Sequence, residues 1–161
     1  MGKTIRLILG DQLNSSHSWY QNISKENLYV MMEIRQETDY AHHHIQKVLA
    51  FFTAMRGFSN QLKACGQEIL YLQLDDPKNT QSLTDNLDWI IKESDGDKFE
   101  YQLPDEYRLD TQLAGYTKRL SISSGYFDTE HFLTQRGDLK NFFGGKKTYL
   151  MDEYLAILEK L

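Results

Sequence analysis

The stretch KTIRLILGDQLN, residues 3–14, decides the fold of this chain. Its apolar half is typical of a buried β-strand, and the run ends at Gly10, which is followed by the polar residues Asp11 and Gln12. In open α/β sheets, ligands bind just beyond the carboxyl ends of the strands, where the strand order reverses. If residues 3–9 form the central strand, we expect a ligand site in the turn directly after it.

The rest of the chain alternates between strand-like and helix-like segments. Strands are predicted over residues 28–33, 68–74, 98–103 and, as a short fifth one, 125–128. Helices are predicted over residues 81–93 and 104–120, and residues 130–143 are expected to be helical or mixed. This alternation predicts a parallel sheet with both faces covered. We therefore predict a single α/β domain over residues 1–161, a Rossmann-like doubly wound fold with a mainly parallel five-stranded sheet and helices on both faces.

The clearest predicted helix covers residues 40–65. Apolar residues recur there at steps of three and four, from Ile45 to Cys65, which is the spacing of one helical face. Thr38 or Asp39 is the expected N-cap, and Gly66 is the expected stop. Cys65 lies on the apolar stripe, so we expect it to be buried as a small hydrophobic residue.

Composition excludes several classes of protein. The chain has 161 residues, a net charge of −5 and one cysteine. An acidic domain is a poor candidate for gripping a nucleic-acid backbone by itself, and a single cysteine cannot form an internal disulfide framework or a multi-thiolate metal site. No apolar stretch approaches membrane length. We expect a cytoplasmic protein with no membrane partner.

The second predicted strand also ends in acidic residues, Glu33 and then Glu37. Because parallel strands end at the same edge of a sheet, Asp11, Gln12 and these two glutamates are expected to share one rim. Such a rim suits a neutral ligand rich in hydrogen-bond donors, such as a sugar, a polyol or a flavin-like ring. It is not a phosphate loop, which requires three glycines in fixed spacing. The alternative is that Gly10 simply makes the turn and Asp11 caps the next segment of the chain.

Two further patterns contain reactive residue types but do not predict a functional site. The three consecutive histidines, 42–44, point about 100° apart on a helix, so they cannot converge on one metal ion, and we expect a solvated helix start with His44 near the rim. Ser15, Ser16, His17 and Asp11 have the residue types of a hydrolytic triad, but the nucleophile elbow is missing. No catalytic residue and no metal ligand is therefore predicted.

Five stretches, taken in order, resemble one family: residues 7–13, Glu33 with Glu37, residues 40–56, residues 102–110 and residues 132–136. The chain resembles the deoxyribodipyrimidine photolyase-related proteins, which are bacterial cryptochromes and (6-4) photolyases with an iron–sulfur cluster. The resemblance implies a Rossmann-like amino-terminal antenna domain for DNA photorepair or blue-light sensing. It implies 6,7-dimethyl-8-ribityllumazine as the chromophore, which absorbs light and passes the excitation to a flavin without bond chemistry.

The resemblance also suggests the contacts and the partner. The expected ring and ribityl contacts are Gly10, Asp11, Gln12, Leu13, Glu33 and Glu37, with Tyr40 and His44 closing the top. FAD, the 4Fe-4S cluster and most of the DNA-lesion pocket belong to a carboxyl-terminal region that residues 1–161 do not include. The expected partner is thus the FAD-binding helical domain of a full-length relative, with DNA involved only indirectly. The alternatives are a stand-alone Rossmann-like ligand-binding protein or enzyme, and an interaction domain with a vestigial site.

Overall fold

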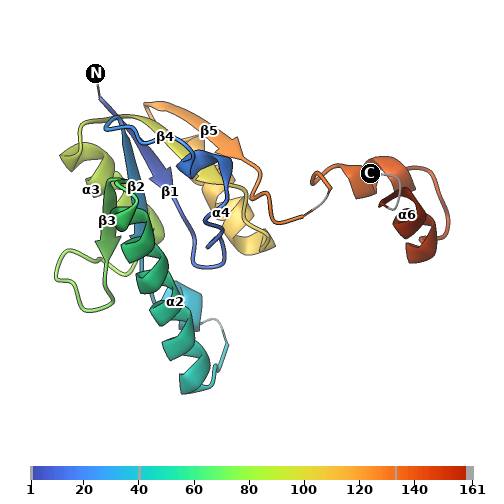
Figure 1. Ribbon diagram of the computed structural model, residues 1–161, viewed down its shortest axis with the longest axis horizontal. Helices are drawn as coiled ribbons and strands as arrows, with labels where there is room; N and C mark the ends of the chain where they lie inside the picture. The colour runs from blue at the N-terminus through green and yellow to red at the C-terminus, as the bar shows by residue number, and fades with distance from the viewer. Residues whose placement is uncertain (1, 40, 133, 159–161) are drawn as a thin grey trace.

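A computed structural model describes residues 2–39, 41–132 and 134–158 of the chain. Its centre is a five-stranded sheet with the order β3-β2-β1-β4-β5, in which every neighbouring pair is parallel (Figure 1). The strands are β1 (Lys3–Leu7), β2 (Asn27–Met32), β3 (Ile69–Leu72), β4 (Gly96–Gln102) and β5 (Ser123–Phe127). The predicted α/β class and the central position of the first strand are confirmed.

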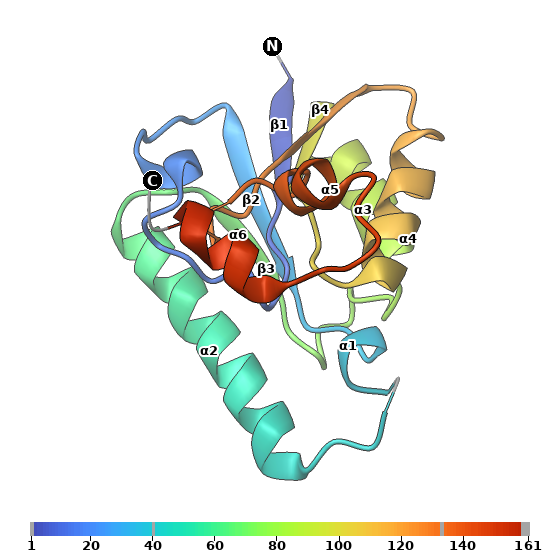
Figure 2. The same ribbon diagram turned by 90° about the vertical axis from the view of Figure 1, so that its right-hand side faces the viewer.

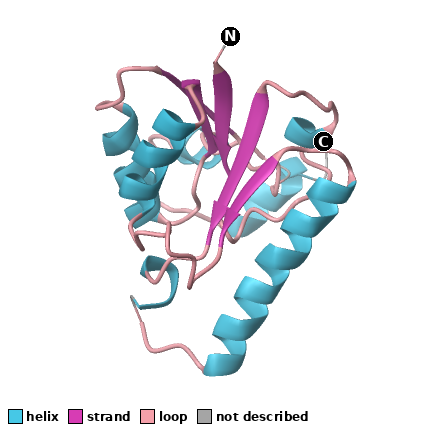
Figure 3. Cartoon of the chain, turned by 90° about the vertical axis from the view of Figure 1, so that its left-hand side faces the viewer, coloured by secondary structure: helices cyan, strands magenta, loops and turns pink. Residues whose placement is uncertain are grey.

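The two faces of the sheet are covered by different helices (Figure 3). Alternate side chains of a strand point to opposite faces, and Ile5, Leu7 and Leu9 pack in one core cluster with residues of α3 (Leu83–Glu93) and α4 (Tyr107–Thr117). On the opposite face, Ile8 packs with residues of α2 (Ile45–Ala64). The strand order reverses at β1, since the chain proceeds outward through β2 and β3 on one side and through β4 and β5 on the other.

The long helix begins later than the periodicity predicted. Thr38 and Asp39 belong to a separate short helix, α1 (Gln36–Asp39), and the N-cap of α2 is His44, whose Nδ1 accepts a hydrogen bond from the backbone N–H of Gln46 at 3.2 Å. The first amide groups of a helix have no internal partner, and the imidazole nitrogen satisfies one of them.

At the end of α2, the prediction for Gly66 is confirmed and the prediction for Cys65 is wrong. Gly66 stops the helix with a φ of +88°, a left-handed conformation that glycine adopts without strain. Cys65 is exposed, not buried. It is the C-cap residue and has left helical geometry, with φ −77° and ψ 2°, so the spacing that aims the preceding residues at the sheet no longer applies to it.

The carboxyl-terminal segment stands away from the sheet in Figure 1, and in the turned view of Figure 2 it lies in front of the strands. Among the described residues of the stretch predicted as helical or mixed, Asp138–Phe143 (α5) alone is helical, and α6 (Met151–Leu158) comes after it. Tyr154 is buried in this segment, with its ring 5.6 Å from that of Phe142. The segment is held to the sheet domain by Arg136, which donates to the carbonyl of Pro104 and, at 3.3 Å, to Asp110. Among the described residues, no helix combines the length and apolar character needed to cross a membrane.

Candidate functional site

A cavity of about 280 Å³ opens at the carboxyl end of β1, between α2 and α4. It therefore lies at the point where the strand order reverses, which is where open α/β sheets bind ligands. Its walls come from the turn after β1, from α1 and α2, and from the start of α4. The lining residues are Asp11, Thr38, His43, Lys47, Val48, Phe51, Glu106 and Leu109.

Gly10 lies next to the lining residues Asp11 and Phe51 and allows a close approach of the helix to the turn. A Cβ atom at position 10 would lie 2.8 Å from Cε1 of Phe51 and 2.9 Å from Sδ of Met55, far inside van der Waals contact. The absence of a side chain is what lets Phe51 of α2 rest on the turn. Gly10 is thus a packing requirement of the site.

Asp11 is the sequence-predicted site residue whose side chain lines the cavity. Desolvation by the surrounding protein raises the pKa of its carboxyl, and the like charges of Asp105 and Glu106 raise it further, against the lowering effect of a backbone hydrogen bond and of His131. Asp11 is nevertheless exposed to solvent, so its carboxylate is accessible to the donor groups of a ligand.

Gln12 and Leu13 lie beside the site without lining it. The Gln12 side chain is buried, accepts from the Leu9 N–H at 3.0 Å and donates to the Gln102 carbonyl at 3.1 Å. It therefore closes the turn and ties β1 to β4. Leu13 packs against the core cluster under α2.

Glu33 is engaged by the protein itself. The residue is 0% exposed, and its two carboxylate oxygens accept hydrogen bonds from Arg56 Nε at 2.6 Å and Nη2 at 2.8 Å, from the Tyr71 hydroxyl at 2.6 Å and from the Leu74 N–H at 2.9 Å. Burial raises the pKa of this carboxyl, but the donors together outweigh burial and hold the pKa below its usual value. The structure does not bring Glu33 to the cavity with Asp11.

The remaining predicted contacts lie around α1 and the start of α2. Glu37 belongs to α1, and Tyr40 lies outside the described residues. His44 is exposed and caps α2, whereas its neighbour His43 lines the cavity and accepts a hydrogen bond from Lys47 Nζ at 3.2 Å. Across residues 2–39, 41–132 and 134–158, no three His, Cys, Asp or Glu side chains are placed to hold a metal ion.

Sequence reasoning missed the part of the site that α2 and α4 contribute. Glu106 could have been found, because it comes after the strand β4 that neighbours β1 and so ends at the same rim. It forms an ion pair with Arg108, at 2.9 Å. Lys47, Val48 and Phe51 read in the sequence as ordinary helix positions, and no local signal separates them from the rest of α2.

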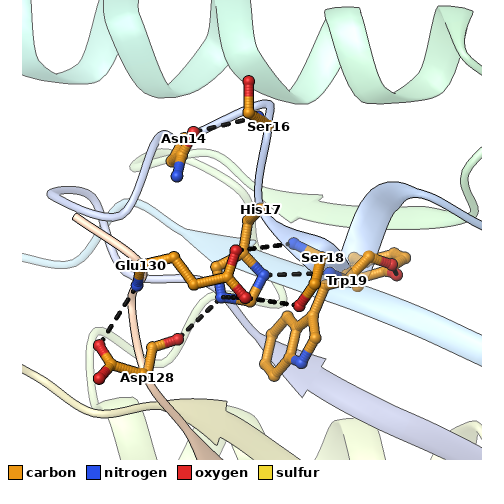
Figure 4. Close-up of polar contacts among 8 residues, drawn as sticks. Asn14, Ser16, His17, Ser18, Trp19, Asp128 and Glu130 are labelled. Atoms are coloured by element: carbon orange, nitrogen blue, oxygen red, sulfur yellow. Dashed lines mark hydrogen bonds and ion pairs between the residues drawn. The ribbon is translucent and has the colours of Figure 1, made fainter. Parts of the chain in front are cut away.

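A group of polar contacts, here called the clasp, anchors the loop that follows the turn after β1 (Figure 4). The clasp consists of His17, Ser18, Trp19, Asp128 and Glu130. His17 is buried, its Nδ1 accepts from the Trp19 N–H at 3.1 Å, and its Nε2 therefore carries the proton that is donated to the Asp128 carbonyl at 2.8 Å. Glu130 accepts from the Ser18 N–H at 3.0 Å and from its hydroxyl at 2.6 Å. The clasp joins the loop after β1 to the segment after β5.

We expect His17→Ala to lower the free energy of unfolding by about 1.5–3 kcal/mol, because it removes a buried ring and leaves two backbone groups without their partner. Ser16→Ala is the control in the same loop, since the Ser16 residue is exposed and only its backbone N–H takes part in the network. Urea denaturation of the two variants measures the difference. Equal effects from the two substitutions would show that the clasp contributes nothing to stability.

Together these features define an open parallel α/β domain with a cavity at its switch point. A family model described as "Deoxyribodipyrimidine photo-lyase-related protein" matches residues 6–156, and the chain belongs to this family. It is 28% identical over 149 residues to a protein named (6-4) photolyase from Agrobacterium fabrum (strain C58 / ATCC 33970). That match covers 92% of this chain and 29% of the relative, so the chain spans less than a third of the relative's length.

Proposed function

We propose that this domain binds an antenna chromophore in the cavity at the end of β1. The observation that carries the proposal is the position of that cavity at the switch point of a photolyase-related α/β domain, with the carboxyl of Asp11 on its wall. The function is light harvesting within a photolyase- or cryptochrome-related protein in the cytoplasm. The excitation would pass to a flavin held by the FAD-binding helical domain of a full-length protein, which is also the domain that would meet DNA.

The chemistry of the walls suits 6,7-dimethyl-8-ribityllumazine. Val48, Phe51 and Leu109 supply apolar surface for the face of the ring. Asp11 and Glu106 offer acceptors for ribityl hydroxyls, while Thr38 and Lys47 offer donors to the carbonyl groups on the ring edge. Ligand sites typically combine such apolar walls with a few placed polar groups.

The size of the cavity also favours a small chromophore. About 280 Å³ lies just under the lower end of typical ligand sites, roughly 300–1,000 Å³. A lumazine is a bicyclic ring with one short polyol chain, whereas a dinucleotide such as FAD needs a much longer groove. The cavity therefore supports an antenna pigment as its occupant and leaves FAD to the partner domain.

The Asp11→Asn variant tests whether the Asp11 carboxylate binds a ligand or only stabilises the turn. The raised pKa of Asp11 in the folded protein means that folding disfavours the charged carboxylate. The protonated carboxyl therefore stabilises the fold below the ordinary pKa of 3.8, and this stabilisation is lost as the pH rises through the folded-state pKa. At pH 7 the neutral asparagine should therefore raise the free energy of unfolding slightly, within about 0.5 kcal/mol. The same change should weaken lumazine binding at least tenfold.

The matched control is Asp105→Asn, which relieves part of the same repulsion but does not line the cavity. It should stabilise the protein without loss of affinity. Thermal melting and fluorescence titration with the lumazine measure the two quantities at pH 7. A loss of stability on Asp11→Asn with unchanged affinity would mean that Asp11 only caps the turn.

A further inference from the structure

The inner wall of the cavity is the ring of Phe51, which is half-buried on α2. Its ring lies 5.7 Å from that of Phe52, which belongs to the core under the helix. The outer edge of the Phe51 ring rests on the turn after β1, where the atoms nearest to a Cβ built on Gly10 are Phe51 Cζ and Cε1 and Met55 Sδ. The ring is thus in contact with the backbone of the turn and packs beside a core side chain.

This packing restricts the ring on the side of the turn. A shift of Phe51 toward the turn would bring it against the Gly10 backbone and the neighbouring Met55, which is 1% exposed. Close-packed interiors yield little to such shifts, and overpacking costs about 1–3 kcal/mol. The ring therefore has little freedom to move toward the turn when a ligand enters.

Two further apolar side chains line the cavity. Val48 lies three residues before Phe51 on the same side of α2, and Leu109 of α4 is 3% exposed and belongs to the core cluster of the other sheet face. These three side chains are the apolar part of the cavity lining. Of these three walls, Phe51 is the bulkiest side chain, so its replacement opens the most room.

We infer that Phe51 is the specificity-determining residue of the site and limits the planar ring system to two fused rings. The inference rests on the proposed function and adds to it the residue that selects the chromophore. Riboflavin and 6,7-dimethyl-8-ribityllumazine form the matched probe pair, because they carry the same ribityl chain and the same pyrimidinedione edge and differ by one fused benzenoid ring.

The experiment measures the dissociation constants of both probes by fluorescence titration, for the wild-type chain, Phe51→Ala and Phe51→Leu. We expect the wild-type chain to prefer the lumazine at least tenfold. Phe51→Ala should reduce that preference at least tenfold, since the vacated space admits the third ring, and Phe51→Leu should fall between the two. Leu49→Ala is the control, because Leu49 lies on the same helix, is 66% exposed and does not line this cavity.

Circular dichroism and thermal melting establish that each variant is folded, and Phe51→Leu keeps most of the side-chain volume if the alanine variant does not fold. A ratio of the two dissociation constants that is the same in all folded variants overturns the inference, even if both probes bind. If neither probe binds the wild-type chain, the proposed function itself falls, and the inference falls with it. The two failures are therefore distinguished by the wild-type titration.

Discussion

Replacing Arg56 with methionine is expected to lower the free energy of unfolding by about 2–4 kcal/mol at pH 7. Arg56 supplies two of the four hydrogen bonds to the carboxylate of Glu33, whose side chain is 0% exposed. Removing one partner of a buried ion pair leaves an uncompensated charge, which typically costs about 3–5 kcal/mol. The expected loss is smaller here because Arg56 is 48% exposed and because Tyr71 and Leu74 still donate to the carboxylate.

The loss should depend on pH in a defined direction. The folded-state pKa of Glu33 is held below the ordinary value of 4.5, so the stability it contributes is present above pH 4.5 and is lost as the pH falls through the folded-state pKa. In the variant the carboxyl loses two of its donors, and burial then favours the protonated form. The difference in stability between wild type and Arg56→Met should therefore shrink on acidification below pH 4.5.

Urea denaturation at pH 7 and in acid measures both effects. Arg35→Met is the matched control, since Arg35 pairs with Asp39 on the surface, with side chains 69% and 53% exposed, and such exposed pairs contribute about 0.3–0.5 kcal/mol. A loss below about 1 kcal/mol for Arg56→Met, or one that persists unchanged in acid, would show that the ion pair does not hold Glu33 in the way the structure indicates.

The second large effect is expected from Gly10→Ala. The new methyl group would lie 2.8 Å from Cε1 of Phe51, so the ring must move, and with it the inner wall of the cavity. We expect a loss of about 1–3 kcal/mol in the free energy of unfolding from this overpacking. Because Phe51 lines the cavity, displacing its ring should also lower lumazine affinity at least tenfold.

Gly57→Ala is the control for Gly10→Ala, and it is expected to have the opposite effect on stability. Gly57 lies in α2, the helix that carries Phe51. A Cβ atom at Gly57 would meet nothing within 4 Å, and alanine in a helix interior is favoured over glycine by about 0.5–1 kcal/mol. This variant should be more stable than wild type and bind the lumazine equally well. Thermal melting and titration of both variants form the comparison. Wild-type affinity in Gly10→Ala would mean that Phe51 does not shape the site.

The fold could be predicted because its signals are local. The apolar run that ends at Gly10 indicated the central strand, and alternation of strands and helices indicated the parallel sheet, both of which the structure confirms. Gly66 was a local stop signal and acts as one. The start of α2 was harder to predict from the sequence. The helix begins after His44, whose side chain caps it, and the apolar periodicity does not mark this position.

The site could be predicted only in part, since its residues meet through tertiary packing. Asp11 can be placed directly by the strand-end argument. Glu33 ends the neighbouring strand in the same way, yet its carboxylate is engaged by Arg56, 23 residues later in the chain, and this pairing exists only once α2 lies on the sheet. Phe51 and Leu109 come from helices on opposite faces of the sheet, so no sequence window contains the cavity.

The most direct test of the central claim is an equilibrium titration of the purified wild-type chain with 6,7-dimethyl-8-ribityllumazine, monitored by absorbance and fluorescence and repeated with Asp11→Asn. Chromophore binding at the end of β1 predicts saturation at one lumazine per chain, a spectral change on binding, and at least tenfold weaker binding to the folded Asp11→Asn variant. No saturable binding to the folded wild-type chain, or equal binding to both proteins, would contradict it.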